Sequence, residues 1–154
     1  MRFAIRAAIV GIAVLTLGFL YFRSLPSDVV AVGAPVRQDD FTYTVTRVVR
    51  HRTNGLVSYV VTVRVDNEAK LVDYRWSDDI VYVTDSNGRR YLPAKPDGSA
   101  ARGRTPVGAG SSAEYEITFD LPFAAEHPML HYWNGIMMGD VFDGAAYGRA
   151  VVAL

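Results

Sequence analysis

The first stretch that could bind a ligand is the loop sequence Asp85-Ser86-Asn87-Gly88, which carries oxygen donors between two apolar runs. Oxygen atoms are the ligands that Ca²⁺ prefers, and an EF-hand loop adds a bidentate Glu at its twelfth position. Counted from Asp85, that position is Pro96, so the EF-hand motif is absent. An Asp that accepts hydrogen bonds from nearby backbone amides is typical of a tight turn, and we expect Asp85 to act in this way.

A weaker calcium site stays open at the adjacent carboxylates Asp78 and Asp79. Neighbouring residues of a strand point to opposite faces, so this pair cannot chelate an ion alone. A loop that brought Asp85 beside them would complete a site with three carboxylates. Solvated charges at the end of a strand are the alternative interpretation.

Histidine and methionine alternate in one short segment, where His127, Met129 and His131 occupy every second position. On a strand, residues two apart share a face. Imidazole and thioether groups suit copper in an extracytoplasmic compartment. Pro128 interrupts a regular strand at this point, and methionine often fills apolar cores. Core packing with surface histidines is therefore the alternative to a copper site.

Large aromatic side chains provide a third candidate surface. Tyr74, Trp76 and Trp133 would form a platform for a glycan or a protein partner if they lay exposed together. Aromatic residues of a small β-domain are more often core residues, some with a polar tip at the surface.

No serine lies in a G-x-S-x-G elbow and no histidine has a recognisable nucleophile, so we expect no enzymatic activity, no catalytic residue and no cofactor.

An uncharged apolar run occupies residues 7–22. Counted from Phe3, with Arg6 reaching toward the headgroups, it approaches the about 20 residues that a helix needs to cross a bilayer. A cleaved signal peptide would end in small residues, whereas this run ends in bulky ones. We therefore predict an uncleaved transmembrane signal anchor at residues 1–23 and a tether at 24–31, with cleavage as the alternative.

The charges around this run predict its orientation. Arg2 and Arg6 precede it and Arg23 follows it, so the positive-inside rule places the N-terminus in the cytoplasm. We expect a single-pass protein of the inner (cytoplasmic) membrane whose C-terminal domain faces the periplasm or the exterior. Without these three arginines the chain has three more acidic than basic residues, which argues against nucleic-acid binding. The chain has no cysteine, so it has neither disulfides nor a lipidated cysteine.

The rest of the chain alternates apolar and polar residues at the period of β-strands. Strands are expected at residues 41–49, 56–66, 80–86, 89–93, 113–122, 129–133 and 146–154. Asn54-Gly55 and Asn87-Gly88 predict hairpin turns, and for Asn87-Gly88 we expect the type I′ that Asn-Gly favours. About seven short strands in one domain predict an all-β fold, an immunoglobulin-like Greek-key β-sandwich over residues 32–154.

Four segments occur in an order that resembles the telokin-like, immunoglobulin-like bacterial ectodomains: VGAPVRQDDFTYTV, YVVTVRVDNEAK, VYVTDSNGRRYLP and GAGSSAEYEITFDLP. The resemblance covers residue 32 to about residue 133, which is most of the predicted ectodomain. The resemblance implies a sandwich fold and an outward location, and it implies no catalytic residues. The chain departs from the lipoproteins of this family because it lacks the lipidation cysteine, which the predicted anchor would replace.

These observations predict a membrane-anchored extracytoplasmic domain that binds a protein or an envelope component by surface contact. Two alternatives stay open. One is a metal-binding domain for calcium or copper, and the other is a glycan-binding module.

Overall fold

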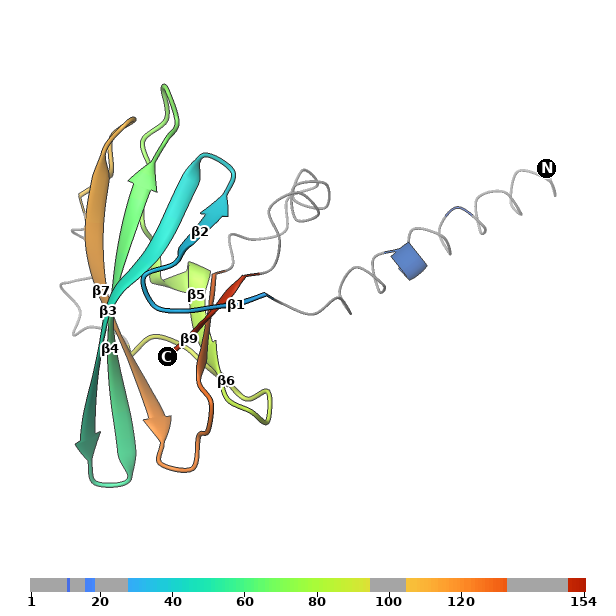
Figure 1. Ribbon diagram of the computed structural model, residues 1–154, viewed down its shortest axis with the longest axis vertical. Coiled ribbons are helices and arrows are strands. Elements are labelled where there is room, and N and C mark those ends of the chain that lie inside the picture. Colours follow the sequence, from blue (N-terminus) through green and yellow to red (C-terminus); the bar gives the residue numbers. More distant parts are fainter. Residues whose placement is uncertain (1–10, 12–15, 19–27, 95–104, 133–149) are drawn as a thin grey trace.

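A computed structural model of the protein describes residues 11, 16–18, 28–94, 105–132 and 150–154. Within these ranges nine strands form two sheets that pack face to face (Figure 1). The predicted all-β sandwich is confirmed, with more short strands than expected. The described part of the predicted anchor is limited to residues 11 and 16–18, which are helical. Among the described residues, no helix has both the length and the apolar character needed to cross a membrane.

The four-stranded sheet has the order β2-β3-β4-β7 and contains the long strands. Its strands are β2 (Pro35–Gln38) and the three long strands β3 (Phe41–Thr53), β4 (Leu56–Asn67) and β7 (Ser112–Pro122). All neighbours are antiparallel, and β4 pairs along nearly its whole length with both β3 and β7. β4 is therefore the strand around which this sheet is built.

The five-stranded sheet has the order β1-β9-β8-β5-β6. Its strands are β1 (Val29–Val30), β5 (Val81–Thr84), β6 (Arg90–Tyr91), β8 (Met129–Tyr132) and β9 (Val151–Ala153), and the 3-10 turn η1 (Asp78–Ile80) precedes β5. β1 pairs in parallel with β9, whereas the other pairs are antiparallel. β1 lies within residues 24–31, which the sequence suggested as a tether.

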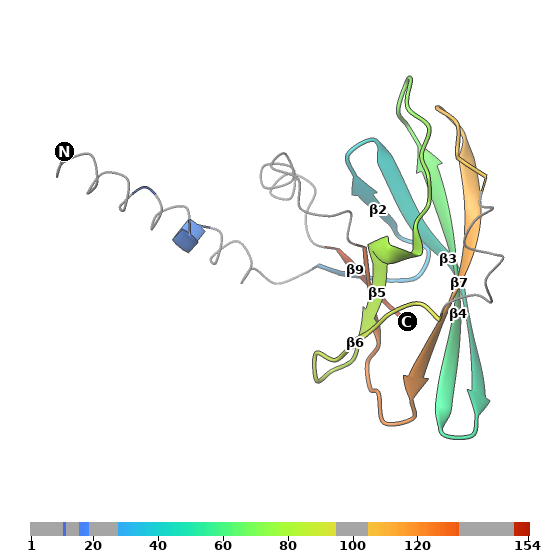
Figure 2. The same ribbon diagram turned by 180° about the vertical axis from the view of Figure 1, so that it is seen from behind.

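The chain passes from one sheet to the other after β1, β4, β6 and β7 (Figures 1 and 2). As a result β4 and β7 are neighbours in one sheet, while β5 and β8, which follow them, are neighbours in the other. The B–E and C–F strand pairs of immunoglobulin domains interlock in the same way. β6 pairs with β5, the place that strand C′ takes in variable-type domains.

The inward faces of the two sheets form one apolar core. β4 and β7 supply every second residue to it, as their alternation predicted: Tyr59, Val61, Val63, Val65, Tyr115, Ile117, Phe119 and Leu121. The second sheet adds Val81, Val83, Leu130 and Val152, which are fully buried. Burying one such side chain stabilises a fold by about 1.5–3 kcal/mol, so these rows hold the sheets together.

A β-bulge interrupts the alternation of β3. The pairing with β4 shifts between Val45 and Arg47, and Thr46 is the extra residue. Before the bulge Tyr43 and Val45 face the core, whereas beyond it Val48 packs against the core opposite Val61. The bulge therefore changes which residues of β3 point inward, and the sequence pattern did not predict this change.

Both predicted Asn-Gly turns form, but the type I′ predicted for Asn87-Gly88 is wrong. A type I′ turn needs a positive φ at both central residues. Gly55 and Gly88 have φ of +86° and +74°, whereas neither Asn54 nor Asn87 has a positive φ. At the second turn, the Gly88 N–H donates to the Asp85 carbonyl (2.9 Å) and the Asp85 N–H donates to the Arg89 carbonyl (3.1 Å). This pattern matches a three-residue hairpin loop that ends in a left-handed glycine.

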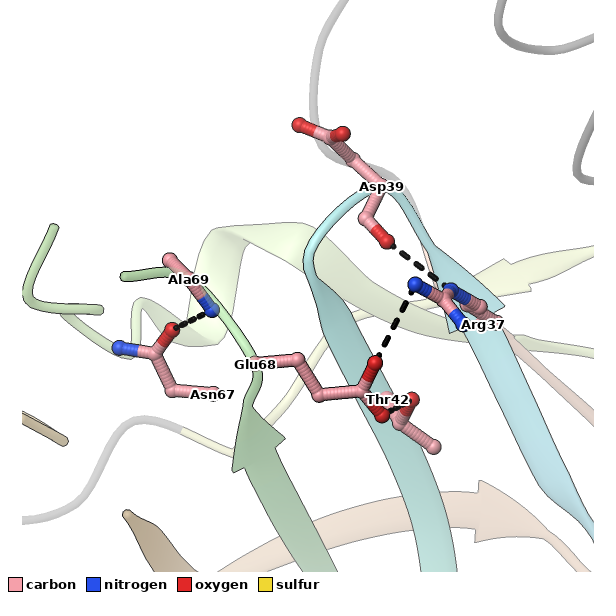
Figure 3. A network of polar contacts seen from close by, with 6 residues as sticks. All are labelled: Arg37, Asp39, Thr42, Asn67, Glu68 and Ala69. Carbon is pink, nitrogen blue, oxygen red and sulfur yellow. Dashed lines mark hydrogen bonds and ion pairs between the residues drawn. The ribbon is translucent and has the colours of Figure 1, made fainter. Parts of the chain in front are cut away.

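Asn67 holds the chain where it leaves β4. Its side chain is 2% exposed, and Nδ2 donates to the carbonyls of Val72 (2.8 Å) and Val107 (2.9 Å). Its Oδ1 accepts a hydrogen bond from the Ala69 N–H (3.0 Å), as Figure 3 shows. The carboxamide thus joins the end of β4, the loop that leads to the second sheet and the segment that enters β7.

Glu68, the next residue, forms a second group of contacts on the surface (Figure 3). Its carboxylate accepts a hydrogen bond from Thr42 Oγ1 (3.2 Å) and forms an ion pair with Arg37 (3.2 Å). Arg37 Nε also donates to the Asp39 carbonyl (3.2 Å). Exposed pairs of this kind contribute at most about 1 kcal/mol, so they position the β2–β3 turn more than they stabilise the fold.

We expect Asn67→Ala to lower the free energy of unfolding by roughly 3 kcal/mol, because it leaves three backbone groups without their partner in a buried place. Urea unfolding followed by circular dichroism measures this loss. Asn87→Ala, at an exposed position of a turn, is the matched control and should change the stability little. Equal stability of the two variants would contradict the role given to Asn67.

Candidate functional site

The outer face of the five-stranded sheet carries a stack of three side chains, Arg90, Tyr82 and His131, which we call the Tyr82 stack. The register of β5 and β8 places Tyr82 opposite His131. Their rings are 4.7 Å apart and nearly parallel, at 4°. The Arg90 guanidinium carbon lies 3.9 Å from the centre of the Tyr82 ring, within the range of a cation–π contact.

The imidazole of His131 is already engaged within this stack. Its Nε2 and Thr84 Oγ1 share a hydrogen bond of 2.8 Å. Burial, followed by the charge of Arg90, lowers the pKa of His131, so the ring is neutral at pH 7. A neutral imidazole is the form that binds a metal, but here one nitrogen is used by the threonine.

The structure brings two of the three copper candidates to one face. Met129 and His131 are the outward residues of β8 and alternate with the buried Leu130 and Tyr132. His127 lies before the strand with a φ of +49°, so the alternation does not extend to it. Within the described ranges, no three His, Asp or Glu side chains gather closely enough to hold a metal ion.

Asp85 lies inside the β5–β6 turn and is 5% exposed. Its Oδ1 accepts hydrogen bonds from the N–H groups of Asn87 and Arg89 (both 2.9 Å), and its Oδ2 accepts one from Tyr91 Oη (3.0 Å). Burial raises the pKa of Asp85, but the hydrogen bonds from Arg89, Tyr91 and Asn87 together outweigh it and hold the pKa below its ordinary value. The carboxylate therefore closes a turn, as its sequence context predicted.

Asp78 and Asp79 lie at the other end of β5, in η1. Asp78 accepts a hydrogen bond from Trp76 Nε1 (2.7 Å). Asp79 exchanges hydrogen bonds with the Ser77 hydroxyl (3.3 Å), which caps the turn. The four residues of β5 separate this pair from Asp85, so the fold does not bring the three carboxylates together.

Two of the three aromatic candidates belong to the core. Trp76 is 8% exposed and stacks on Tyr115, with ring centres 4.9 Å apart. Tyr74 is half-buried, and its hydroxyl accepts a hydrogen bond from the Tyr43 hydroxyl (3.4 Å). Tyr74 and Trp76 therefore do not form the exposed platform that the sequence suggested. Trp133 lies outside the described residues.

The buried tyrosines offer no base. Burial raises the pKa of Tyr43, Tyr74 and Tyr132 above the ordinary value, so each phenol is neutral at pH 7.

The sequence did not single out Tyr82 or Arg90 as candidate site residues. The sequence alone shows that Tyr82 and Arg90 occupy positions of two predicted strands. That they lie next to each other and to His131 follows only from the register of β5, β6 and β8.

We expect Asp85→Asn to lower the free energy of unfolding at neutral pH and to flatten its dependence on pH below about 4. The folded pKa of Asp85 lies below the ordinary value of 3.8, so the charged carboxylate stabilises the fold above that value. This stabilisation is lost as the pH falls through the folded pKa. Urea unfolding at a series of acidic pH values measures the slope. An unchanged slope in Asp85→Asn would refute the assignment.

Tyr132 provides a second prediction, because its buried hydroxyl has no hydrogen-bond partner in the described part of the chain. Tyr132→Phe should leave the free energy of unfolding unchanged or raise it by about 1 kcal/mol, since an unpartnered buried hydroxyl is destabilising. Tyr115→Phe removes the bond from Tyr115 Oη to the Thr105 carbonyl (3.1 Å) and should lower stability by about 1 kcal/mol. A larger loss in Tyr132→Phe than in Tyr115→Phe would show that the Tyr132 hydroxyl is bonded.

No protein-family model and no curated protein matches this chain. Solved bacterial structures do match its fold. MPT63, described as a secreted protein from Mycobacterium tuberculosis, is 11% identical with a TM-score of 0.57, and the match covers 85% of this chain and 100% of MPT63. The yjhA protein from Bacillus subtilis is 14% identical with a TM-score of 0.55, over 80% of this chain and 98% of that protein.

A putative lipoprotein, YcdA from Bacillus subtilis, is 11% identical with a TM-score of 0.57. The match covers 78% of this chain but 38% of YcdA. At these identities the similarity shows the fold alone. The chain therefore shares its β-sandwich fold with several bacterial proteins.

Proposed function

We propose that this chain is a membrane-anchored, extracytoplasmic member of the telokin-like, immunoglobulin-like domains, and that it binds a protein or an envelope component without enzymatic activity. The observation that carries this proposal is the sandwich fold that the chain shares with one protein described as secreted and another described as a putative lipoprotein. The apolar run supports the same location, because counted from Phe3 to Phe22, with Arg6 reaching toward the headgroups, its length suits a membrane-spanning helix.

The edge of β7 is the surface that best suits a partner strand. Among the edges of the two described sheets it is the longest, with 11 residues against four in β2 and two in β1 and β6. The Thr118 carbonyl of β7 accepts a hydrogen bond from the Ala94 N–H (2.8 Å), so the segment after β6 covers one point of this edge. Addition of a strand to such an edge is a common mode of peptide recognition.

The charge of this edge suggests the chemistry of the partner. Glu114, Glu116 and Asp120 alternate with the buried residues of β7 and point outward. A row of like charges opposes pairing between two copies of the chain. It favours a partner strand that carries basic residues.

The geometry supports the metal and glycan alternatives less well. The carboxylates Asp78 and Asp85 are engaged in separate local contacts, and the Trp76 ring is buried in the core. Binding by surface contact does not require these carboxylates to be free or the Trp76 ring to be exposed.

The location is tested by fractionating cells that express the full chain. We expect the protein in membranes after an alkaline carbonate wash, at the mass of the uncleaved chain, and accessible to protease from the outer side. The reason is that an uncleaved apolar helix keeps its domain attached to the bilayer. A protein released by carbonate would contradict the anchor, and a smaller mass would indicate cleavage.

Partner binding is tested in the same membranes with a photo-reactive residue placed at Glu114. We expect one reproducible cross-linked product from this position and none from the control position Ser86, which lies exposed in the β5–β6 turn. The product should weaken at high salt, since the edge is acidic. Failure of every exposed position of β7 to yield a product would remove this edge as the binding surface.

A further inference from the structure

The end of the β3–β4 hairpin is basic. No Asp or Glu occurs between Thr46 and Val63, whereas Arg47, Arg50 and Arg52 do. The ion pairs among the described residues join Arg37 to Glu68 and Arg64 to Asp66. The three arginines of the hairpin therefore have no carboxylate partner in the described part of the chain, and their charges are not neutralised there.

The bulge at Thr46 determines where two of these arginines point. Beyond it the register pairs Arg50 with Tyr59 and Arg52 with Val57, on the inward face of the sheet. The Arg50 guanidinium carbon lies 5.3 Å from the centre of the Tyr59 ring. That of Arg52 lies 5.0 Å from the centre of the Phe123 ring. Cation–π contacts of this kind hold a guanidinium in place and leave its charge intact.

The nearest carboxylate in the strand pairing does not offset these charges. Asp120 lies opposite Ser58, whose hydroxyl donates a hydrogen bond to it. Ser58 lies between Val57 and Tyr59 on the strand, so it points to the other face. The face that carries Arg50 and Arg52 therefore keeps its positive charge.

Two apolar side chains lie exposed at the outermost part of the hairpin. Leu56 follows the turn and is 44% exposed, and Phe123 in the β7–β8 turn is 55% exposed. The Phe123 N–H donates to the Gly55 carbonyl (3.1 Å), which joins the two turns. Both views show the β3–β4 turn and the β7–β8 turn side by side at the lower end of the sandwich (Figures 1 and 2). We call Arg50, Arg52, Leu56 and Phe123 the basic tip.

We infer that the basic tip docks onto the surface of a membrane that contains anionic lipids. Leu56 and Phe123 would enter the interfacial layer, where aromatic and apolar side chains are favoured. Arg50 and Arg52 would lie behind them at the depth of the lipid phosphates, which attract basic residues. A soluble polyanion would need the arginines only, so the exposed Leu56 and Phe123 favour a lipid surface. The inference rests on the proposed anchored location, which keeps the tip within reach of a bilayer, and it requires no protein partner.

The absence of cysteine from the chain allows a direct test. Asn54→Cys, in the hairpin turn, accepts a fluorophore whose emission reports polarity. The full chain is reconstituted into nanodiscs of phosphatidylcholine alone or of phosphatidylcholine mixed with phosphatidylglycerol. We expect a blue shift of emission in the anionic discs that high salt reverses, and no shift in the neutral discs. A label at Ser86→Cys, in the β5–β6 turn, should not respond.

Variants of the basic tip test the residues themselves. In the labelled chain, Arg50→Gln with Arg52→Gln should lower the equilibrium constant for docking roughly 30-fold, because two basic contacts with the anionic surface are lost. Lys70→Gln with Arg75→Gln removes the same charge from exposed positions in the loop after β4, at the opposite end of the sandwich (Figure 1), and should leave docking unchanged. Thermal unfolding of each variant checks that the fold is intact.

Three results would overturn the inference. They are an unshifted label in anionic discs, an equal shift in neutral discs, and a shift with soluble polyphosphate as large as the shift with lipid. These results are distinguishable from a failure of the proposed function. If Glu114 still gives its cross-linked product but the tip does not dock, only this inference is rejected. If carbonate releases the chain from the membrane, the anchored location is rejected.

Discussion

The fold depends on a buried carboxamide at the end of its central strand. Asn67 is the last residue of β4, which is hydrogen-bonded to a strand on each side. The Asn67 side chain forms hydrogen bonds with three backbone groups that belong to two other segments. One of these segments carries the chain to the second sheet and the other returns it to β7. The Tyr74 and Val107 backbones also pair with each other, so both segments are fixed where they pass. A polar group without these bonds would be costly in so buried a place.

The long strands were predictable from sequence because their residues alternate without interruption. Tyr59, Val61 and Val63 of β4 needed no knowledge of the partner strand to be assigned to the core. The short strand β1 carries no such pattern: it has two residues, and it exists because Val29 and Val30 lie beside β9. The bulge at Thr46 was equally hidden, since a change of face depends on the pairing with β4 and not on the composition of β3.

The candidate site residues were predictable to different degrees. Asp85 could be assigned to a turn because an Asp two residues before Asn-Gly makes local bonds. The Tyr82 stack could not be predicted, since Arg90, Tyr82 and His131 come from three strands and meet only through their register. Trp76 and Asp78 appeared as separate candidates, an aromatic and a carboxylate, whereas the structure joins them by one hydrogen bond at the edge of the core.

The residues of β3 on the two sides of the bulge differ in how freely they can be substituted. Before Thr46, residues such as Tyr43 and Val45 are enclosed on all sides, so most changes there would damage folding. Beyond it, Arg50, His51 and Arg52 are exposed, and substitutions at such positions usually alter stability little. The outer half of the hairpin can therefore diverge in charge and shape among descendants of this sequence while the inner half stays fixed.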